Sequence, residues 1–117
     1  LLPEAVEERL GFRHLERAGF DRIPGEDLQA VLFDSAVNHG PRRAVRFLQA
    51  ALGVEQDGAL GPVTLAALPY IDARRVVIRV LAERVRFYGE IITRTPSQAA
   101  FAEGWANRVA ELMEGVA

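Results

Sequence analysis

The chain has 117 residues, half of them apolar, and its 14 basic and 16 acidic residues leave a formal net charge of −2. This length and apolar content suit one hydrophobic core in a single domain. The absence of cysteine excludes disulfides and thiolate metal sites, and the lack of a basic excess argues against nucleic acid as a partner. The sequence displays no signal peptide and no apolar run long enough for membrane insertion.

Glycines and prolines divide the chain into about six segments whose apolar residues follow helical rather than alternating periodicity. We therefore predict an all-α fold. The first helix is expected over residues 3–18, with acidic residues near its start and Gly19 at its end. Residues 1–27 then form an N-terminal helix and connector.

Residues 25–39 predict a central, buried helix, because apolar side chains surround nearly its whole circumference. These side chains are Leu28, Val31, Leu32, Phe33, Ala36 and Val37. The polar residues Asp27, Asp34 and Asn38 fall on one narrow strip of the same helix. Such a strip either braces a neighbouring helix or lines a cleft.

Four further helices are expected, over residues 41–52, 62–68 and 72–92 and from Ser97 onward, where Ser97 serves as the N-cap. Gly40 is expected in the left-handed conformation between the second and third helices. The predicted solvent side of 41–52 comprises Arg42, Arg43, Arg46 and Gln49. The predicted inward residues of 72–92 are Val77, Leu81, Val85, Tyr88 and Ile92. The predicted stripe of the last helix is Phe101, Trp105, Val109, Leu112 and Met113.

Few residues have the pattern of a catalytic or metal site. The two histidines, His14 and His39, lack a second His or Cys at ligand spacing, so we expect neither a metal nor a cofactor. Ser35 and Ser97 lack a nucleophile elbow. Sugar hydrolysis needs two carboxyl groups facing one cleft. Asp34 is the acid with the most apolar surroundings, but a single buried acid is more often a structural brace than a catalyst.

Several blocks of sequence follow one another in an order typical of a known family. They are residues 33–44 (FDSAVNHGPRRA), 47–54 (FLQAALGV), 57–65 (DGALGPVTL), 86–88 (RFY) and 104–109 (GWANRV). Together they resemble the C-terminal part of glycoside hydrolase family 108, a predicted peptidoglycan-binding domain, over roughly residues 28–112.

This resemblance implies a lysozyme-like, mainly helical protein that cleaves or binds the glycan of the bacterial cell wall. Family members carry an N-terminal catalytic segment with a Glu-Gly-Gly motif, and that motif does not occur in these 117 residues. No catalytic residue can therefore be carried over, and whether the chain is an enzyme stays open.

The candidate substrate-binding residues are Asp34, Asn38, His39 and Arg42, which we expect to face a groove and to hydrogen-bond glycan hydroxyl and acetamido groups. Tyr88 or Trp105 would add an apolar platform for a sugar ring. Structural roles are the alternative for the same residues. Asn38 can satisfy backbone at a helix end, Trp105 can pack in the core, and residues 57–64 can form a turn through Gly58, Pro62 and Thr64.

Three functions follow from these features. The first is a peptidoglycan-binding domain of a cell-wall-lytic muramidase, from a phage endolysin or a secretion-associated enzyme, that binds glycan strands and is not catalytic by itself. The second is a trimmed form of an active N-acetylmuramidase, and the third a structural or protein-interaction domain of a phage tail or secretion machine. The expected partner is the glycan strand of peptidoglycan. A catalytic segment, or proteins of a phage or secretion system, are expected as further partners. The expected location is the periplasm, the cell wall or a phage particle.

Overall fold

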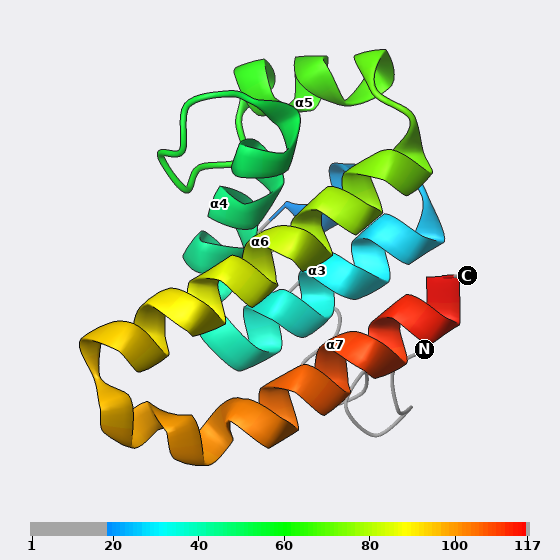
Figure 1. Ribbon diagram of the computed structural model, residues 1–117. Coiled ribbons are helices and arrows are strands. Elements are labelled where there is room, and N and C mark those ends of the chain that lie inside the picture. Colours follow the sequence, from blue (N-terminus) through cyan, green and yellow to red (C-terminus); the bar gives the residue numbers. More distant parts are fainter. Residues whose placement is uncertain (1–18, 117) are drawn as a thin grey trace.

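The computed structural model describes residues 19–116, and every regular element in this range is helical (Figure 1). The α-helices are α3 (Glu26–His39), α4 (Pro41–Leu52), α5 (Pro62–Ala67), α6 (Ala73–Arg94) and α7 (Ala102–Val116). Short 3-10 turns are η2 (Phe20–Arg22), η3 (Leu68–Tyr70) and η4 (Pro96–Phe101). The predicted all-α class is confirmed. The helix predicted over residues 3–18 lies outside the described residues.

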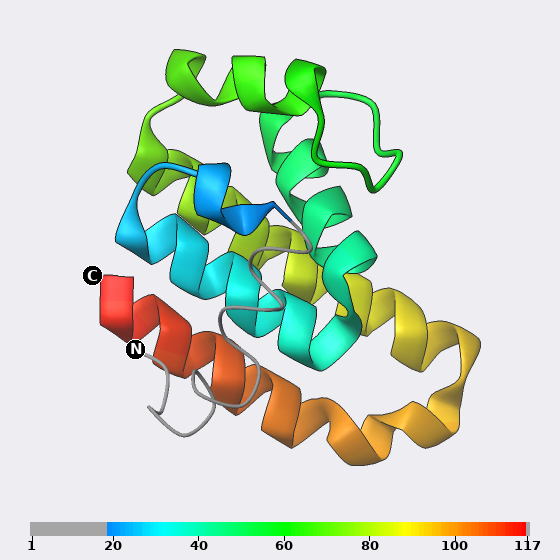
Figure 2. The same ribbon diagram turned by 180° about the vertical axis from the view of Figure 1, so that it is seen from behind.

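Helices α3, α4 and α6 pack against one another, and α7 returns along α6 after the turn at η4. Figures 1 and 2 show the axes of α3, α6 and α7 roughly aligned, with α7 running in the opposite direction to α6, while α4 crosses them steeply and α5 lies at one end. Figure 2 also shows η2 lying over the far side of α3. The core lies where α3, α4 and α6 meet.

Helix α3 is the central, buried helix that its composition predicts, because its apolar residues are covered from several sides. Leu28, Val31, Leu32, Phe33 and Ala36 are all buried, whereas Val37 stays partly exposed. The helix ends at Gly40, whose N–H donates to the carbonyl of Ala36 at 2.8 Å. Gly40 has φ +90° and ψ 152°, so it is not in the predicted left-handed helical region, although its positive φ still favours glycine.

Besides Gln49, described below, four side chains do not lie where the sequence predicts. Val85, expected to point inward from α6, is 55% exposed, because it faces a shallow apolar groove between α6 and α7. Phe101 and Met113 are also more than half exposed. Ser97 makes no capping hydrogen bond, because residues 96–101 form the 3-10 turn η4 and α7 begins only at Ala102.

Gln49 is the largest departure from the predicted pattern, because it is 1% exposed although it was expected on the solvent side of α4. Its amide donates to Asp57 Oδ1 at 2.7 Å, to the carbonyl of Ala59 at 3.0 Å and to Thr64 Oγ1 at 3.1 Å. Its Oε1 accepts from the N–H of Gly58 at 2.9 Å. The loop after α4 folds over Gln49, which converts a solvent-side position into a buried one.

The longest helix, α6, is amphipathic. Its buried side carries Val76, Val77, Val80 and Leu81, and its exposed side carries several arginines. None of the helices in the described part of the chain combines the length and the apolar character that a membrane span requires.

Candidate functional site

Asp34, the acid singled out in the sequence, lies in the interior between three helices. Its side chain is only 3% exposed. Oδ2 accepts a hydrogen bond from Arg84 Nη1 of α6 at 2.8 Å, and Oδ1 accepts one from Arg108 Nε of α7 at 2.6 Å. Two guanidinium groups thus bind one buried carboxylate, and each bond is charge-assisted. This arrangement ties α3 to both α6 and α7.

Arg84 is the centre of this arrangement, because it is almost wholly buried and uses each of its nitrogens. Besides Asp34, its Nη1 donates to Ser35 Oγ at 3.2 Å. Its Nε and Nη2 both donate to Tyr88 Oη, at 3.2 and 2.9 Å. A buried arginine is tolerated only when its charge is paired and its donors are satisfied, and Arg84 meets both conditions.

His39 completes the chain of polar contacts, with its Nε2 2.8 Å from Tyr88 Oη. Because Arg84 can only donate, Tyr88 Oη accepts from it and donates its own proton to His39 Nε2. His39 is therefore neutral, with its proton on Nδ1. Burial, reinforced by the positive charge of Arg84, lowers the pKa of His39 from 6.5 to about 4. Burial also raises the pKa of Tyr88. We call Asp34, Arg84, Arg108, Tyr88 and His39 the Arg84 network.

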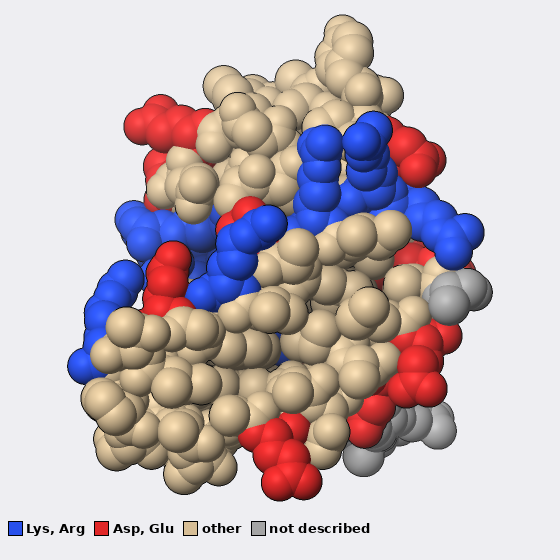
Figure 3. Space-filling view, in the orientation of Figure 1, with Lys and Arg blue, Asp and Glu red and all other residues tan. Residues whose placement is uncertain are grey.

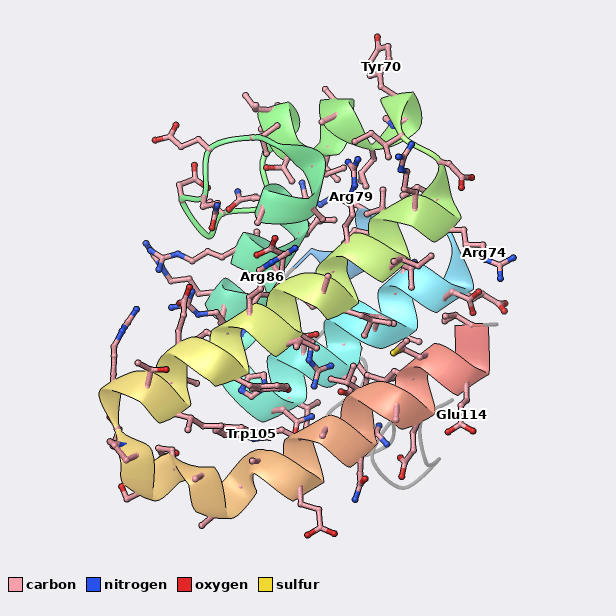
Figure 4. The ribbon with its side chains drawn as sticks, in the orientation of Figure 1. Tyr70, Arg74, Arg79, Arg86, Trp105 and Glu114 are labelled. Carbon is pink, nitrogen blue, oxygen red and sulfur yellow. The ribbon has the colours of Figure 1, made fainter. Side chains whose placement is uncertain are left out.

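Aromatic rings from α4, α6 and α7 pack around this network. The ring of Tyr88 stacks on Trp105 with 4.6 Å between centroids and 11° between planes. His39 makes edge contacts with Phe47, Phe87 and Trp105. Trp105 lies on α7 near η4 (Figure 4), only partly buried, and packs against the core. One face of Trp105 is thus already used by Tyr88 rather than presented to a sugar.

The structure brings five of the six predicted substrate-binding residues together: Asp34, Asn38, His39, Tyr88 and Trp105. Asn38 Nδ2 donates to the backbone carbonyl of Asp34 at 2.9 Å and to its Oδ2 at 3.3 Å. Arg42 lies apart from this group. Its side chain covers Gly58 in the loop after α4, where an added Cβ would lie 2.5 Å from Arg42 Cγ. The close approach and the φ of +78° both require glycine there.

A second group of arginines lines a surface cavity of about 110 Å³ between α4 and α6. We call this cavity the arginine pocket, and its lining residues are Arg43, Arg46, Phe47, Ala50, Gln56, Glu83, Arg86, Phe87 and Glu90. The guanidinium of Arg43 lies over the ring of Phe87, 4.7 Å from its centroid. Figure 4 shows Arg86 where α6 crosses α4. Figure 3 shows the basic side chains gathered over α4 and α6, with fewer charges over η4 and α7.

Arg43 and Arg46 differ from Arg84 in their partners. Arg46 Nε is buried and has no hydrogen-bond partner among the described residues. Burial lowers the pKa of Arg43, and the positive charge of Arg46 lowers it further. An unsatisfied buried donor costs free energy. The pocket is therefore suited to a ligand that supplies acceptor oxygens.

Arg84 and the arginine pocket were both missed in the sequence, where the arginines of residues 41–52 were assigned to a solvated face. One signal for Arg84 was available. It lies three residues after Leu81 and four before Tyr88, on the inward stripe of α6, and a buried Asp34 needs an opposite charge. Among the described residues, no group of three or more His, Cys, Asp or Glu is placed to hold a metal ion.

A family model described as "Predicted Peptidoglycan domain" matches residues 43–110 of the chain. This range includes Arg43, Arg46, Arg84, Phe87 and Arg108. Among solved structures, the chain is similar to the one titled "Structure of Brucella abortus SagA", with 26% identity and a TM-score of 0.79. The match covers 98% of this chain and 64% of the SagA chain. No curated protein matches the sequence.

Proposed function

Because the chain belongs to the predicted peptidoglycan domain family, we propose that it is the wall-binding domain of a cell-wall-lytic muramidase. In this proposal it binds glycan strands without cleaving them by itself, and the catalytic segment lies outside these 117 residues. Peptidoglycan as the partner and the cell wall as the place of action follow from the family. Assignment to glycoside hydrolase family 108, and to a phage or secretion setting, belongs to the proposal.

The arginine pocket is the observation that carries this proposal. It lies within the segment matched by the family model and combines an aromatic ring, Phe87, with guanidinium donors on a surface otherwise built from packed helices. Sugar rings pack their C–H faces on aromatic rings, and their hydroxyl and acetamido groups accept hydrogen bonds. Asn38, His39 and Trp105 offer a second contact surface along α3 and α7.

The geometry of the acids supports binding rather than hydrolysis. A muramidase needs one carboxyl group that can donate a proton and a second one across the cleft. Both oxygens of Asp34 already accept from arginines. Glu26 lies exposed at the start of α3 and lines a different cavity. An active N-acetylmuramidase trimmed to this chain is the alternative, and Glu83 and Glu90 of the arginine pocket would then be the first acids to replace.

The test is a pull-down on purified peptidoglycan sacculi, with the turbidity of the same suspension followed over time. We expect binding without clearing. Clearing would contradict the non-catalytic assignment, and neither binding nor clearing would favour a structural or protein-interaction domain.

Two matched substitutions locate the binding surface. Phe87→Leu removes the ring of the arginine pocket, whereas Phe101→Leu removes an exposed ring on η4 beside Trp105. We expect Phe87→Leu to weaken binding by about threefold to tenfold and Phe101→Leu to leave it unchanged. The reverse result would place the glycan on the Trp105 side of the molecule.

A further inference from the structure

The charges around the arginine pocket do not balance internally. The pocket has two carboxylates, and each has an arginine partner: Arg86 Nη1 lies 2.8 Å from Glu83 Oε1, and Arg94 Nη2 lies 3.6 Å from Glu90 Oε2. Arg43 and Arg46 have no carboxylate within ion-pair distance in the described part of the chain. Two guanidinium groups therefore share one cavity without a directly paired carboxylate, and Glu90 acts on Arg43 only from beyond ion-pair distance.

The surroundings of these two arginines strengthen their need for an anion. Arg43 and Arg46 lie close enough for their charges to disfavour one another, and both are only partly exposed. Arg46 Nε lies beneath the surface without an acceptor. An arriving anion would relieve the repulsion between the charges and satisfy the buried donor. Neutral sugar hydroxyls would satisfy the donor alone.

We infer that the arginine pocket binds a free carboxylate of the wall's stem peptides, with Arg43 and Arg46 as the two guanidinium donors. This inference rests on the proposed function and deepens it, because it assigns recognition to the peptide as well as to the glycan. Guanidinium groups bind carboxylates through paired, parallel hydrogen bonds. Glycan hydroxyl and acetamido groups are uncharged, so the stem peptide supplies the anion.

The size of the cavity agrees with a single carboxylate. Pockets for drug-sized ligands have volumes of roughly 300–1,000 Å³, so a cavity of about 110 Å³ suits a carboxylate with its adjoining methylene rather than a disaccharide. The ring of Phe87, which lines the same cavity, offers an apolar wall for that methylene. The sugar rings of the strand would then lie at the mouth of the cavity, against the part of the Phe87 ring that stays exposed.

The experiment compares three wall preparations. Sacculi are first stripped of phosphate-containing polymers with hydrofluoric acid, which leaves the stem-peptide carboxylates. Half of this material is then amidated with carbodiimide and ammonium, which neutralises the carboxylates and leaves the glycan unchanged. Untreated sacculi are the third preparation. Binding of the whole chain to each is measured by co-sedimentation.

The variants are Arg43→Gln/Arg46→Gln and the control Arg74→Gln/Arg75→Gln, which removes two exposed arginines from the first turn of α6. Unfolding curves followed by the fluorescence of Trp105, the single tryptophan of the chain, show whether each variant is folded. A charge-retaining pair, Arg43→Lys/Arg46→Lys, separates net charge from the forked geometry of arginine.

We expect the wild type to bind amidated sacculi about tenfold more weakly than acid-stripped sacculi. The Arg43→Gln/Arg46→Gln variant should bind acid-stripped sacculi more weakly than the wild type by the same factor, and amidation should weaken its binding no further. The Arg43→Lys/Arg46→Lys variant should recover only part of the lost binding. The control pair should bind like the wild type.

Three results would overturn the inference while leaving the proposed function intact. The first is that the wild type binds equally well before and after amidation. The second is that Arg74→Gln/Arg75→Gln loses as much binding as Arg43→Gln/Arg46→Gln. The third is that binding falls on acid stripping but not on amidation, which would identify phosphate as the anion. Failure of the wild type to bind any preparation would overturn the proposed function and this inference with it.

Discussion

The Arg84 network and the arginine pocket use the same side chain in opposite ways. In the network, Arg84 is 1% exposed and its donors are satisfied by Asp34, Ser35 and Tyr88. In the pocket, Arg43 and Arg46 lie at the surface of α4 without a carboxylate partner among the described residues. The two regions meet where His39 of the network contacts Phe87 of the pocket, with 5.4 Å between the ring centroids.

The contrast shows why buried charge alone does not identify a functional site. A fully satisfied arginine stabilises the packing of three helices and has nothing left to offer a ligand. A partly buried arginine with an unsatisfied donor contributes little to stability and can gain from binding. Substitutions in the first region should therefore change stability, and substitutions in the second should change binding.

The largest expected effect is a loss of stability in the Arg84 network that has no counterpart in the arginine pocket. Arg84→Met should lower the free energy of unfolding by about 3–5 kcal/mol, because it removes one of the two countercharges of buried Asp34 and leaves Tyr88 Oη and Ser35 Oγ without their donor. Arg46→Met should change it by no more than about 0.5 kcal/mol. Urea unfolding followed by Trp105 fluorescence measures both. Equal losses would show that the pocket arginines are structural too.

A second pair of substitutions tests the same contrast with a neutral side chain. Gln49→Ala should lower the free energy of unfolding by about 2–3 kcal/mol, because it breaks the hydrogen bonds to Asp57, Ala59 and Thr64 that hold the loop after α4. Gln56→Ala, at an exposed residue lining the arginine pocket, should cause no measurable loss. Thermal unfolding by circular dichroism compares the two, and a similar loss in both would contradict the assignment of Gln49.

Within the Arg84 network, Tyr88→Phe keeps the ring stacked on Trp105 but removes the hydroxyl that joins Arg84 to His39. We expect a loss of about 1–2 kcal/mol in the free energy of unfolding. Tyr70→Phe is the matched control, because Tyr70 projects into solvent from η3 (Figure 4). If Tyr88→Phe loses no more stability than Tyr70→Phe within experimental error, the hydroxyl does not hold the network together.

The smallest effect is a pH dependence that arises from His39. As the pH falls below 6.5, the unfolded chain binds a proton at this residue, whereas the folded chain does so only near its pKa of about 4. Stability is therefore lost as the pH falls from 6.5 to 4 and is unaffected above 6.5. Because the ring is only partly buried, we expect about 1 kcal/mol in total. In His39→Gln the loss of stability between pH 6.5 and 4 should be smaller by this amount, as measured by urea unfolding at each pH. If the free energy of unfolding changes with pH as it does in the wild type, the pH dependence comes from other groups.

Helix boundaries were predictable because they depend on nearby residues. The pairs Gly40-Pro41 and Gly61-Pro62 begin α4 and α5, and Gly53 ends α4, as local backbone conformation dictates. The burial of α3 was predictable from its near-uniform apolar surface. The start of α7 was not, because Ser97 had a plausible capping position and only the packing of η4 against α6 decides that α7 begins at Ala102.

The candidate site was predictable only in part. Asp34, His39 and Tyr88, which the sequence predicts as binding residues, lie close together in the structure, but the cation that pairs with Asp34 lies 50 residues further along the chain. By itself, the sequence determined the helical class, most helix ends and the burial of α3, because these depend on local backbone preferences and on the apolar pattern within one helix. Only the tertiary structure decided which arginine is paired with a carboxylate in the interior and which keeps unsatisfied hydrogen-bond donors at the surface. This depends on which side chains the packing of α3, α4, α6 and α7 brings within hydrogen-bond distance.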